Sequence, residues 1–179
     1  MREGRFRLYS SAQLDAVLDR MAHQAAGLLA HAADPLLLGI LRRGVPLAEM
    51  MQARLAARGM RVPRLVLELK RYADDLALLH PETALAENAE LSGRDLSRAA
   101  VMVIDDVLYE GHSAARILAY LSQRGVQEVR VAVLVDRCVP RLPVRADIAG
   151  IRLQVAPGDV VECRVPPYEP EFAIDLVRH

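Results

Sequence analysis

Residues 99–113 carry the sequence AAVMVIDDVLYEGHS, and this stretch decides the fold. It begins with six apolar residues, the pattern of a strand that is buried on both faces of a parallel sheet. Two carboxylates, Asp105 and Asp106, follow at once, and a short loop through Gly111 leads into a helical pattern that begins at Ser113. Ligands of open α/β sheets bind outside the carboxyl ends of the strands, so the stretch predicts a binding site as well as a strand–loop–helix unit.

The residue types in this loop favour a sugar phosphate as the ligand. A loop that enters a helix N-terminus presents backbone N–H groups, and such groups bind phosphate. The two carboxylates can accept hydrogen bonds from vicinal hydroxyls and can hold Mg²⁺ through water. Taken alone, the same two acids could instead form the metal site of a phosphatase-like α/β protein.

A second strand–loop–helix junction lies earlier in the chain. Residues 36–41 are apolar, the loop Arg42-Arg43-Gly44 follows, and residues 45–58 have a helical pattern. Two guanidinium groups beside a backbone turn suit a second anionic group such as pyrophosphate. The alternative is a pair of arginines on a surface turn.

The remaining segments extend this α/β pattern. Ser10 and Gln13 have the spacing of a capping box before a helix. An alternating strand is expected at 62–69 and a buried strand at 129–135. This alternation predicts a mainly parallel sheet with right-handed crossovers. The weakly patterned, polar residues 70–98 predict a lid or mobile loop, with a hairpin around His80-Pro81 as the alternative.

Composition limits the classes of protein to which the chain can belong. With 179 residues, of which 53% are hydrophobic, a single domain with a sizeable core is expected. The net charge is zero, so no global field attracts nucleic acid or membrane. Cys138 and Cys163 fit neither a disulfide framework nor a zinc spacing, and no early apolar run has signal or membrane-spanning length. A cytoplasmic protein is therefore expected.

Several motifs together resemble one known family. The run 103–113 resembles the phosphoribosyl-pyrophosphate (PRPP) motif of type I phosphoribosyltransferases. More narrowly, Asp105-Asp106-Val107-Leu108-Tyr109 before a glycine loop is similar to the pyrimidine-operon regulator/uracil phosphoribosyltransferase (PyrR) family. Other stretches resemble this family in order and spacing, and the resemblance covers about residues 8 to 155; these stretches are 20–23, 39–44, 72–76, 134–137 and 142–147.

The resemblance implies a fold, a domain division and a reaction. The fold would be a mainly parallel twisted sheet flanked by helices, with a small hood from the C-terminal part and the N-terminus. One phosphoribosyltransferase domain would span 1–179, with a core of about 12–138, a flexible loop of about 70–98 and a hood and tail of about 139–179. The reaction would convert uracil and PRPP to UMP and pyrophosphate with Mg²⁺ as cofactor.

The resemblance also implies roles for individual residues. The expected catalytic residues are Asp105, Asp106, Lys70 and Arg71, and Mg²⁺ would be bound through PRPP near the two aspartates. The residues that would bind the 5′-phosphate are Tyr109, Glu110, Gly111, His112 and Ser113. Pyrophosphate would be bound by Arg42, Arg43 and Gly44, and the base by Asp136 and Arg137. An RNA-binding face would consist of Arg20, His23, Arg141, Arg145 and Arg152.

The chain departs from the family pattern at several of these positions. Glu110 stands where the phosphate loop normally has threonine, and His112 replaces a usual arginine. Ala73 replaces an arginine of the flexible loop. Pro140 and Ile151 replace cations that contribute to RNA binding in the family. A carboxylate aimed at a phosphate would repel it, so Glu110 is expected either to weaken PRPP binding or to turn away from the ligand.

Two alternatives to a uracil enzyme stay open at this point. One is a nucleotide-sensing regulator that binds the mRNA of pyrimidine genes, with weak catalysis or none. The other is a phosphoribosyltransferase of another base, which the Asp136-Arg137 stretch disfavours. We expect a homo-oligomer, a dimer or larger, because type I phosphoribosyltransferases are commonly oligomeric.

Overall fold

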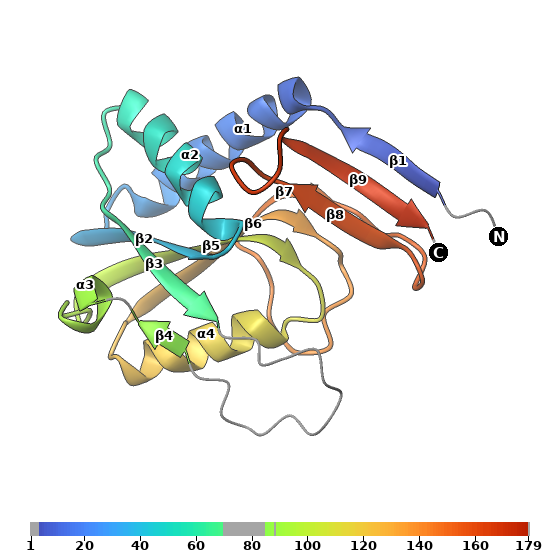
Figure 1. Ribbon diagram of the computed structural model, residues 1–179. Coiled ribbons are helices and arrows are strands. Elements are labelled where there is room, and N and C mark those ends of the chain that lie inside the picture. Colours follow the sequence, from blue (N-terminus) through green and yellow to red (C-terminus); the bar gives the residue numbers. More distant parts are fainter. Residues whose placement is uncertain (1–3, 70–84, 88, 179) are drawn as a thin grey trace.

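The computed structural model describes residues 4–69, 85–87 and 89–178, and a six-stranded sheet lies at its centre (Figure 1). In spatial order the strands are β4 (Leu85–Glu87), β3 (Arg64–Leu69), β2 (Asp34–Leu41), β5 (Ala99–Leu108), β6 (Glu128–Asp136) and β7 (Ile148–Arg152). All neighbouring pairs are parallel except β3 and β4. This is the mainly parallel sheet that the sequence predicts.

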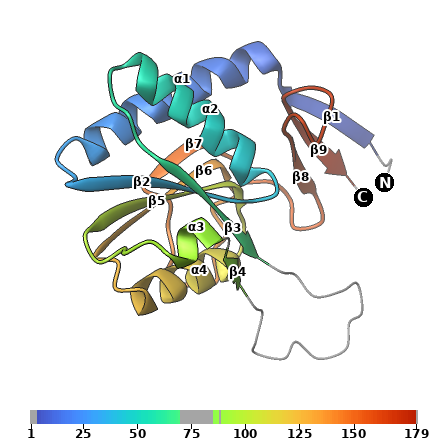
Figure 2. The same cartoon turned by 60° about the vertical axis from the view of Figure 1, so that its left-hand side comes forward.

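Helices cover both faces of this sheet. The helices α1 (Ser11–Leu29) and α2 (Gly44–Ala57) lie on one face, and α4 (His112–Gln123) lies with the short α3 (Ala89–Ser92) on the other (Figures 1 and 2). The expected capping box is present, because the Ser10 backbone N–H donates to Gln13 Oε1 at 2.9 Å. None of the described helices is both long enough and apolar enough to cross a membrane.

Strand β5 is central because its apolar residues fill both cores. Alternate residues of a strand point to opposite faces of the sheet. Ala100, Met102 and Ile104 accordingly belong to the core beneath α1 and α2. Ala99, Val101 and Val103 belong to the core that includes residues of α3 and α4. The six apolar residues that open the motif therefore hold the carboxylates that follow at a fixed edge of the sheet.

A second, three-stranded antiparallel sheet forms the hood. It consists of β1 (Gly4–Tyr9), β9 (Ala173–Arg178) and β8 (Val160–Arg164), in that spatial order. Asp175 of β9 is 1% exposed and accepts hydrogen bonds from Arg7 Nε at 2.6 Å and Arg5 Nη1 at 3.1 Å. Burial raises the pKa of Asp175, but the hydrogen bonds from Arg7 and Arg5, together with the charges of Arg7 and Arg164, lower that pKa overall. Charge pairing therefore supplements apolar packing in the hood.

The main sheet and the buried core include parts of the chain that the expected division assigned to the hood and to the flexible loop. The core was expected to end near residue 138, but β7 belongs to the main sheet because it pairs with β6, so the segment 139–152 belongs with the core. The flexible loop was expected to extend to residue 98, yet Leu91 and Leu96 are buried beneath the α4 face. The residues 70–84 of that loop, including His80-Pro81, lie outside the described part of the chain.

Candidate active site

The two carboxylates lie at the carboxyl end of β5, at a cleft of about 1120 Å³ between the sheet and the hood. Asp105 Oδ1 accepts a hydrogen bond from the Asp106 N–H at 2.9 Å, and Asp106 Oδ1 accepts one from the Val107 N–H at 3.0 Å. Each carboxylate is thus oriented by the next peptide group. Most of the predicted site residues in the described chain line this cleft: Arg42, Arg43, Asp105, Asp106, Tyr109, Glu110, Gly111, His112, Ser113 and Arg137.

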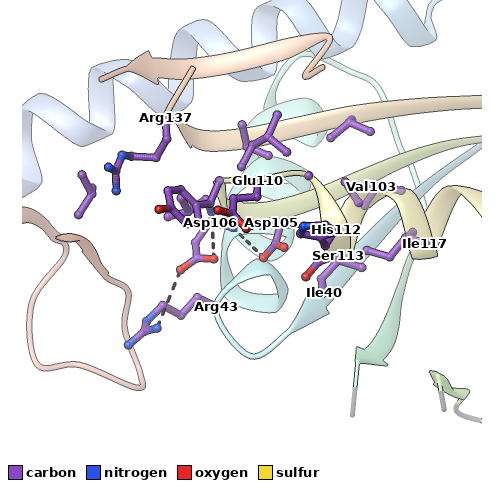
Figure 3. A pocket seen from close by; sticks show the side chains of 18 of the residues that line it. Ile40, Arg43, Val103, Asp105, Asp106, Glu110, His112, Ser113, Ile117 and Arg137 are labelled. Atoms are coloured by element: carbon purple, nitrogen blue, oxygen red, sulfur yellow. Dashed lines mark hydrogen bonds and ion pairs between the residues drawn. The ribbon is translucent and has the colours of Figure 1, made fainter. Parts of the chain in front are cut away.

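The first loop reaches the carboxylates because Gly44 has no side chain. A Cβ atom at Gly44 would lie 2.3 Å from the Ile104 carbonyl oxygen and 3.1 Å from Asp105 Cα. The start of α2 therefore packs directly against β5. Arg43 Nη1 lies 3.9 Å from Asp106 Oδ2, which Figure 3 shows as a contact across the cleft. The two predicted strand–loop–helix junctions form one site.

The hood supplies two residues that sequence reasoning missed. Glu169 Oε1 accepts hydrogen bonds from Arg43 Nε at 3.1 Å and Arg43 Nη2 at 2.5 Å, while Glu169 Oε2 accepts one from the Val165 N–H at 2.7 Å. The Arg43 guanidinium lowers the pKa of Glu169. The Tyr168 ring lies 5.1 Å from the Arg42 guanidinium carbon. No sequence signal identified these residues, which lie among prolines in an irregular segment.

The second loop turns into α4 at Gly111. Gly111 is the N-cap residue and has a φ of 90°, a left-handed conformation that glycine adopts without strain. Figure 3 shows His112 and Ser113 on the α4 side of the two aspartates. Glu110 is paired: its Oε1 lies 3.1 Å from Arg141 Nε, and its Oε2 lies 3.6 Å from His112 Nε2. The departure from threonine at residue 110 therefore comes with a charge partner.

The two residues predicted for base binding have different positions. Arg137 is 6% exposed, lines the cleft and lies 5.1 Å from the Tyr109 ring centroid. Among the described residues its Nε has no hydrogen-bond partner, so a polar group of a ligand would satisfy it. Asp136 is not part of the cleft lining, because its Oδ1 accepts the Cys138 N–H at 2.8 Å and caps the turn after β6.

The five cations of the predicted RNA face come from three separate elements. Arg20 on α1 donates from Nη2 to the Gly150 carbonyl oxygen of β7 at 2.5 Å. Arg141 pairs with Glu110, and Arg152 Nε lies 3.9 Å from Asp136 Oδ2. His23 and Arg145 are exposed. Three of the five cations are thus engaged by protein groups.

The described residues contain no group of three or more His, Cys, Asp or Glu side chains that could hold a metal ion on their own. Mg²⁺ commonly binds through one or two carboxylates together with substrate phosphates, and Asp105 and Asp106 fit that donor set. The predicted catalytic cations Lys70 and Arg71, and the stretch 72–76, lie outside the described residues.

Comparison with known proteins identifies the class. The model of the phosphoribosyl transferase domain family matches residues 8–168. A solved structure of the hypoxanthine phosphoribosyltransferase of Trypanosoma cruzi aligns with a TM-score of 0.76 at 13% identity, and the match covers 96% of this chain and 95% of that one. The fold is that of the type I phosphoribosyltransferases.

Two curated relatives narrow the class. The "Bifunctional protein PyrR" of Deinococcus radiodurans is 34% identical over 171 residues, 94% of this chain and 92% of the relative. The protein of that name from Actinobacillus pleuropneumoniae is 30% identical over 171 residues, 93% of each chain. The chain belongs to the PyrR family of phosphoribosyltransferases, as its motifs predict.

Proposed function

We propose that the protein is a Mg²⁺-dependent phosphoribosyltransferase that converts uracil and PRPP to UMP and pyrophosphate. One observation carries the proposal: a carboxylate pair lies between two helix-opening loops in a single cleft. PRPP has two hydroxyls between two phosphate-bearing ends, and this arrangement of groups matches the cleft. The base is inferred from the PyrR relatives and from the polar Nε of Arg137.

In this reaction uracil N1 forms a bond to C1 of the ribose, the bond from C1 to the pyrophosphate oxygen breaks, and N1 loses its proton. Asp105 and Asp106 would bind the ribose hydroxyls and stabilise the positive charge that develops on the sugar. The Ser113 hydroxyl and the backbone N–H groups that open α4 would hold the 5′-phosphate. Arg42 and Arg43 would hold the leaving pyrophosphate. Mg²⁺, bound through the two aspartates and the substrate, would neutralise charge on the leaving group.

The first test measures UMP formation from uracil and PRPP with Mg²⁺, beside a PRPP binding titration. Turnover with uracil and not with hypoxanthine or cytosine is the expected result. Turnover with hypoxanthine and not with uracil would mean that the substrate is a purine base. Binding of PRPP without turnover on any base would contradict the enzyme and favour a nucleotide sensor. Neither binding nor turnover would mean that the altered loops take a different ligand.

A second candidate function is regulation of pyrimidine genes through RNA. The name of the curated relatives, "Bifunctional protein PyrR", favours it, and His23 and Arg145 are exposed. Engagement of Arg20, Arg141 and Arg152 by protein groups argues for weak binding, since RNA affinity depends on cations that reach phosphates. An assay of RNA binding with and without UMP tests this function. An RNA affinity that does not change with UMP would contradict a nucleotide-sensing regulator.

We also propose a homo-oligomer, in line with the type I phosphoribosyltransferases. Light scattering at micromolar concentration measures its mass, and a monomer mass would contradict this proposal.

A further inference from the structure

The second loop carries a charge that opposes the ligand proposed for it. Glu110 lines the cleft, its side chain is 25% exposed, and it lies immediately before the residues that open α4. A phosphate monoester brings about two further negative charges at neutral pH. Like charges at close range in a partly exposed site weaken binding by roughly tenfold. The loop therefore requires something that offsets Glu110.

Arg141 supplies the offset from outside the loop. Its Nε lies 3.1 Å from Glu110 Oε1, and its backbone N–H donates to the Glu110 carbonyl oxygen at 2.9 Å. Its neighbours pack on the same loop, since a Cβ atom at Gly111 would lie 3.6 Å from Val144 Cβ and 3.8 Å from Pro140 Cβ. Arg141 is thus fixed beside Glu110 by its backbone as well as by its charge.

We propose that Arg141 is a positioning residue of the active site, which neutralises the Glu110 carboxylate and holds it so that the loop can accept a 5′-phosphate. The inference rests on the proposed function in that it takes this loop as the phosphate subsite. Arg141 acts through Glu110 and does not itself contact the ligand. It belongs to the site and not to an RNA-binding face.

One other arrangement would use the same residues differently. The Arg141 side chain is 75% exposed, so in this second arrangement its guanidinium leaves Glu110 and binds the phosphate directly. The two roles differ in how Arg141 and Glu110 depend on each other. If Arg141 acts through Glu110, removing the Glu110 charge makes Arg141 dispensable. If Arg141 binds the phosphate, its loss weakens binding whether Glu110 is charged or not. A double-mutant cycle separates them.

The experiment measures dissociation constants by calorimetry for UMP and ribose 5-phosphate, with uridine as the ligand that lacks a phosphate. Arg141→Ala should weaken the two phosphate ligands roughly tenfold and leave uridine within about twofold. In the Glu110→Gln background the same substitution should cost less than about twofold. Arg141→Lys keeps the charge and should stay within about threefold of the parent protein.

Arg130→Ala is the matched control. Arg130 also pairs with carboxylates, Glu128 at 3.0 Å and Asp147 at 3.2 Å, and it does not line the cleft. Its loss should leave all three ligands unchanged. Thermal unfolding of each variant checks that the fold is retained.

An equal loss of phosphate affinity from Arg141→Ala in both backgrounds would overturn the inference, and so would no loss in the parent background. Ribose 5-phosphate separates this test from the proposed reaction, because it carries neither base nor pyrophosphate. Suppose that the affinities for ribose 5-phosphate follow the expected double-mutant cycle but uracil is not turned over. The uracil reaction would then be contradicted, and the role inferred for Arg141 would be supported. A parent protein that binds neither phosphate ligand would overturn the inference itself.

Discussion

The two loops at the cleft have opposite arrangements of charge. In the loop after β2 the cation Arg43 belongs to the loop, and its acid partner Glu169 comes from the segment that precedes β9 in the hood. In the loop after β5 the acid Glu110 belongs to the loop, and its cation Arg141 comes from the segment after β6. The first loop therefore carries a cation of its own, whereas the second loop has a cation beside it only through Arg141. Charge that a helix-opening loop lacks can be supplied by a residue distant in sequence.

The strongest test removes the charges of the two aspartates that lie between the loops. Asp105→Asn with Asp106→Asn should weaken PRPP binding by at least a hundredfold, because both carboxylates lie between the loops and would bind the ribose hydroxyls. A PRPP titration measures it, with circular dichroism to confirm folding. If the double variant bound PRPP as tightly as the parent protein does, the two aspartates would not bind PRPP. One PRPP molecule spanning both loops would then be contradicted.

The second test moves one loop away from the aspartates. Gly44→Ala should destabilise the fold by about 3 kcal/mol and weaken PRPP binding more than tenfold, because the added Cβ would meet backbone of β5. Gly111→Ala is the comparison in the other loop. It meets no atom closer than 3.6 Å and should cost only about 1–2 kcal/mol from its positive φ. Denaturant unfolding measures both. A larger loss for Gly111→Ala would mean that the second loop is the more constrained one.

The third test releases the cation of the first loop. Glu169→Gln keeps the acceptor for the Val165 N–H and removes the charge that holds Arg43. Inorganic pyrophosphate should bind about three- to fivefold tighter, since Arg43 no longer has to leave a carboxylate. UMP, which lacks a pyrophosphate, is the control and should be unaffected. Weaker pyrophosphate binding would instead show that Glu169 positions Arg43 for the ligand.

The smallest effect concerns pH. The pKa of Glu169 lies below its ordinary value of 4.5, so the pair with Arg43 stabilises the fold fully above that value and loses this contribution as the pH falls through the lowered pKa. The protein should be more stable than Glu169→Gln by roughly 1 kcal/mol at pH 7, and this difference should begin to fall below pH 4.5 and vanish below the lowered pKa. Urea unfolding at several pH values measures it. A difference that does not change with pH would mean that the pair contributes no charge-dependent stability.

The local sequence was sufficient to predict both junctions but not their partners. The apolar run before Asp105 and the helical pattern after Gly44 are contiguous signals, so strands, loops and helices could be placed from them. Glu169 and Arg141 carry no such signal, because their roles depend on contacts with residues 126 and 31 positions away. The resemblance to the family implied a hood, yet no residue pattern predicted β1 or β9, which are short strands interrupted by charged residues.

Asp136 and Arg137 illustrate a second limit. Asp136 is the last residue of β6 and Arg137 follows it, so their position at a strand end predicted a shared role in the cleft. Side chains of neighbouring residues at a strand end point in different directions, and here Asp136 caps the turn at Cys138 while Arg137 enters the cleft. The backbone conformation of the turn, with a φ of 55° at Cys138, decides between the two, and the sequence does not reveal it.

The pairing of β1 with β9 has a consequence for the order of events during synthesis. Gly4 pairs with Arg178, so β1 cannot pair with β9 until nearly the whole described chain has been translated. The strands of the main sheet all end by Arg152, so they are translated before the hood strands β8 and β9. A nascent chain therefore possesses both cleft loops before it possesses Glu169, which pairs with Arg43.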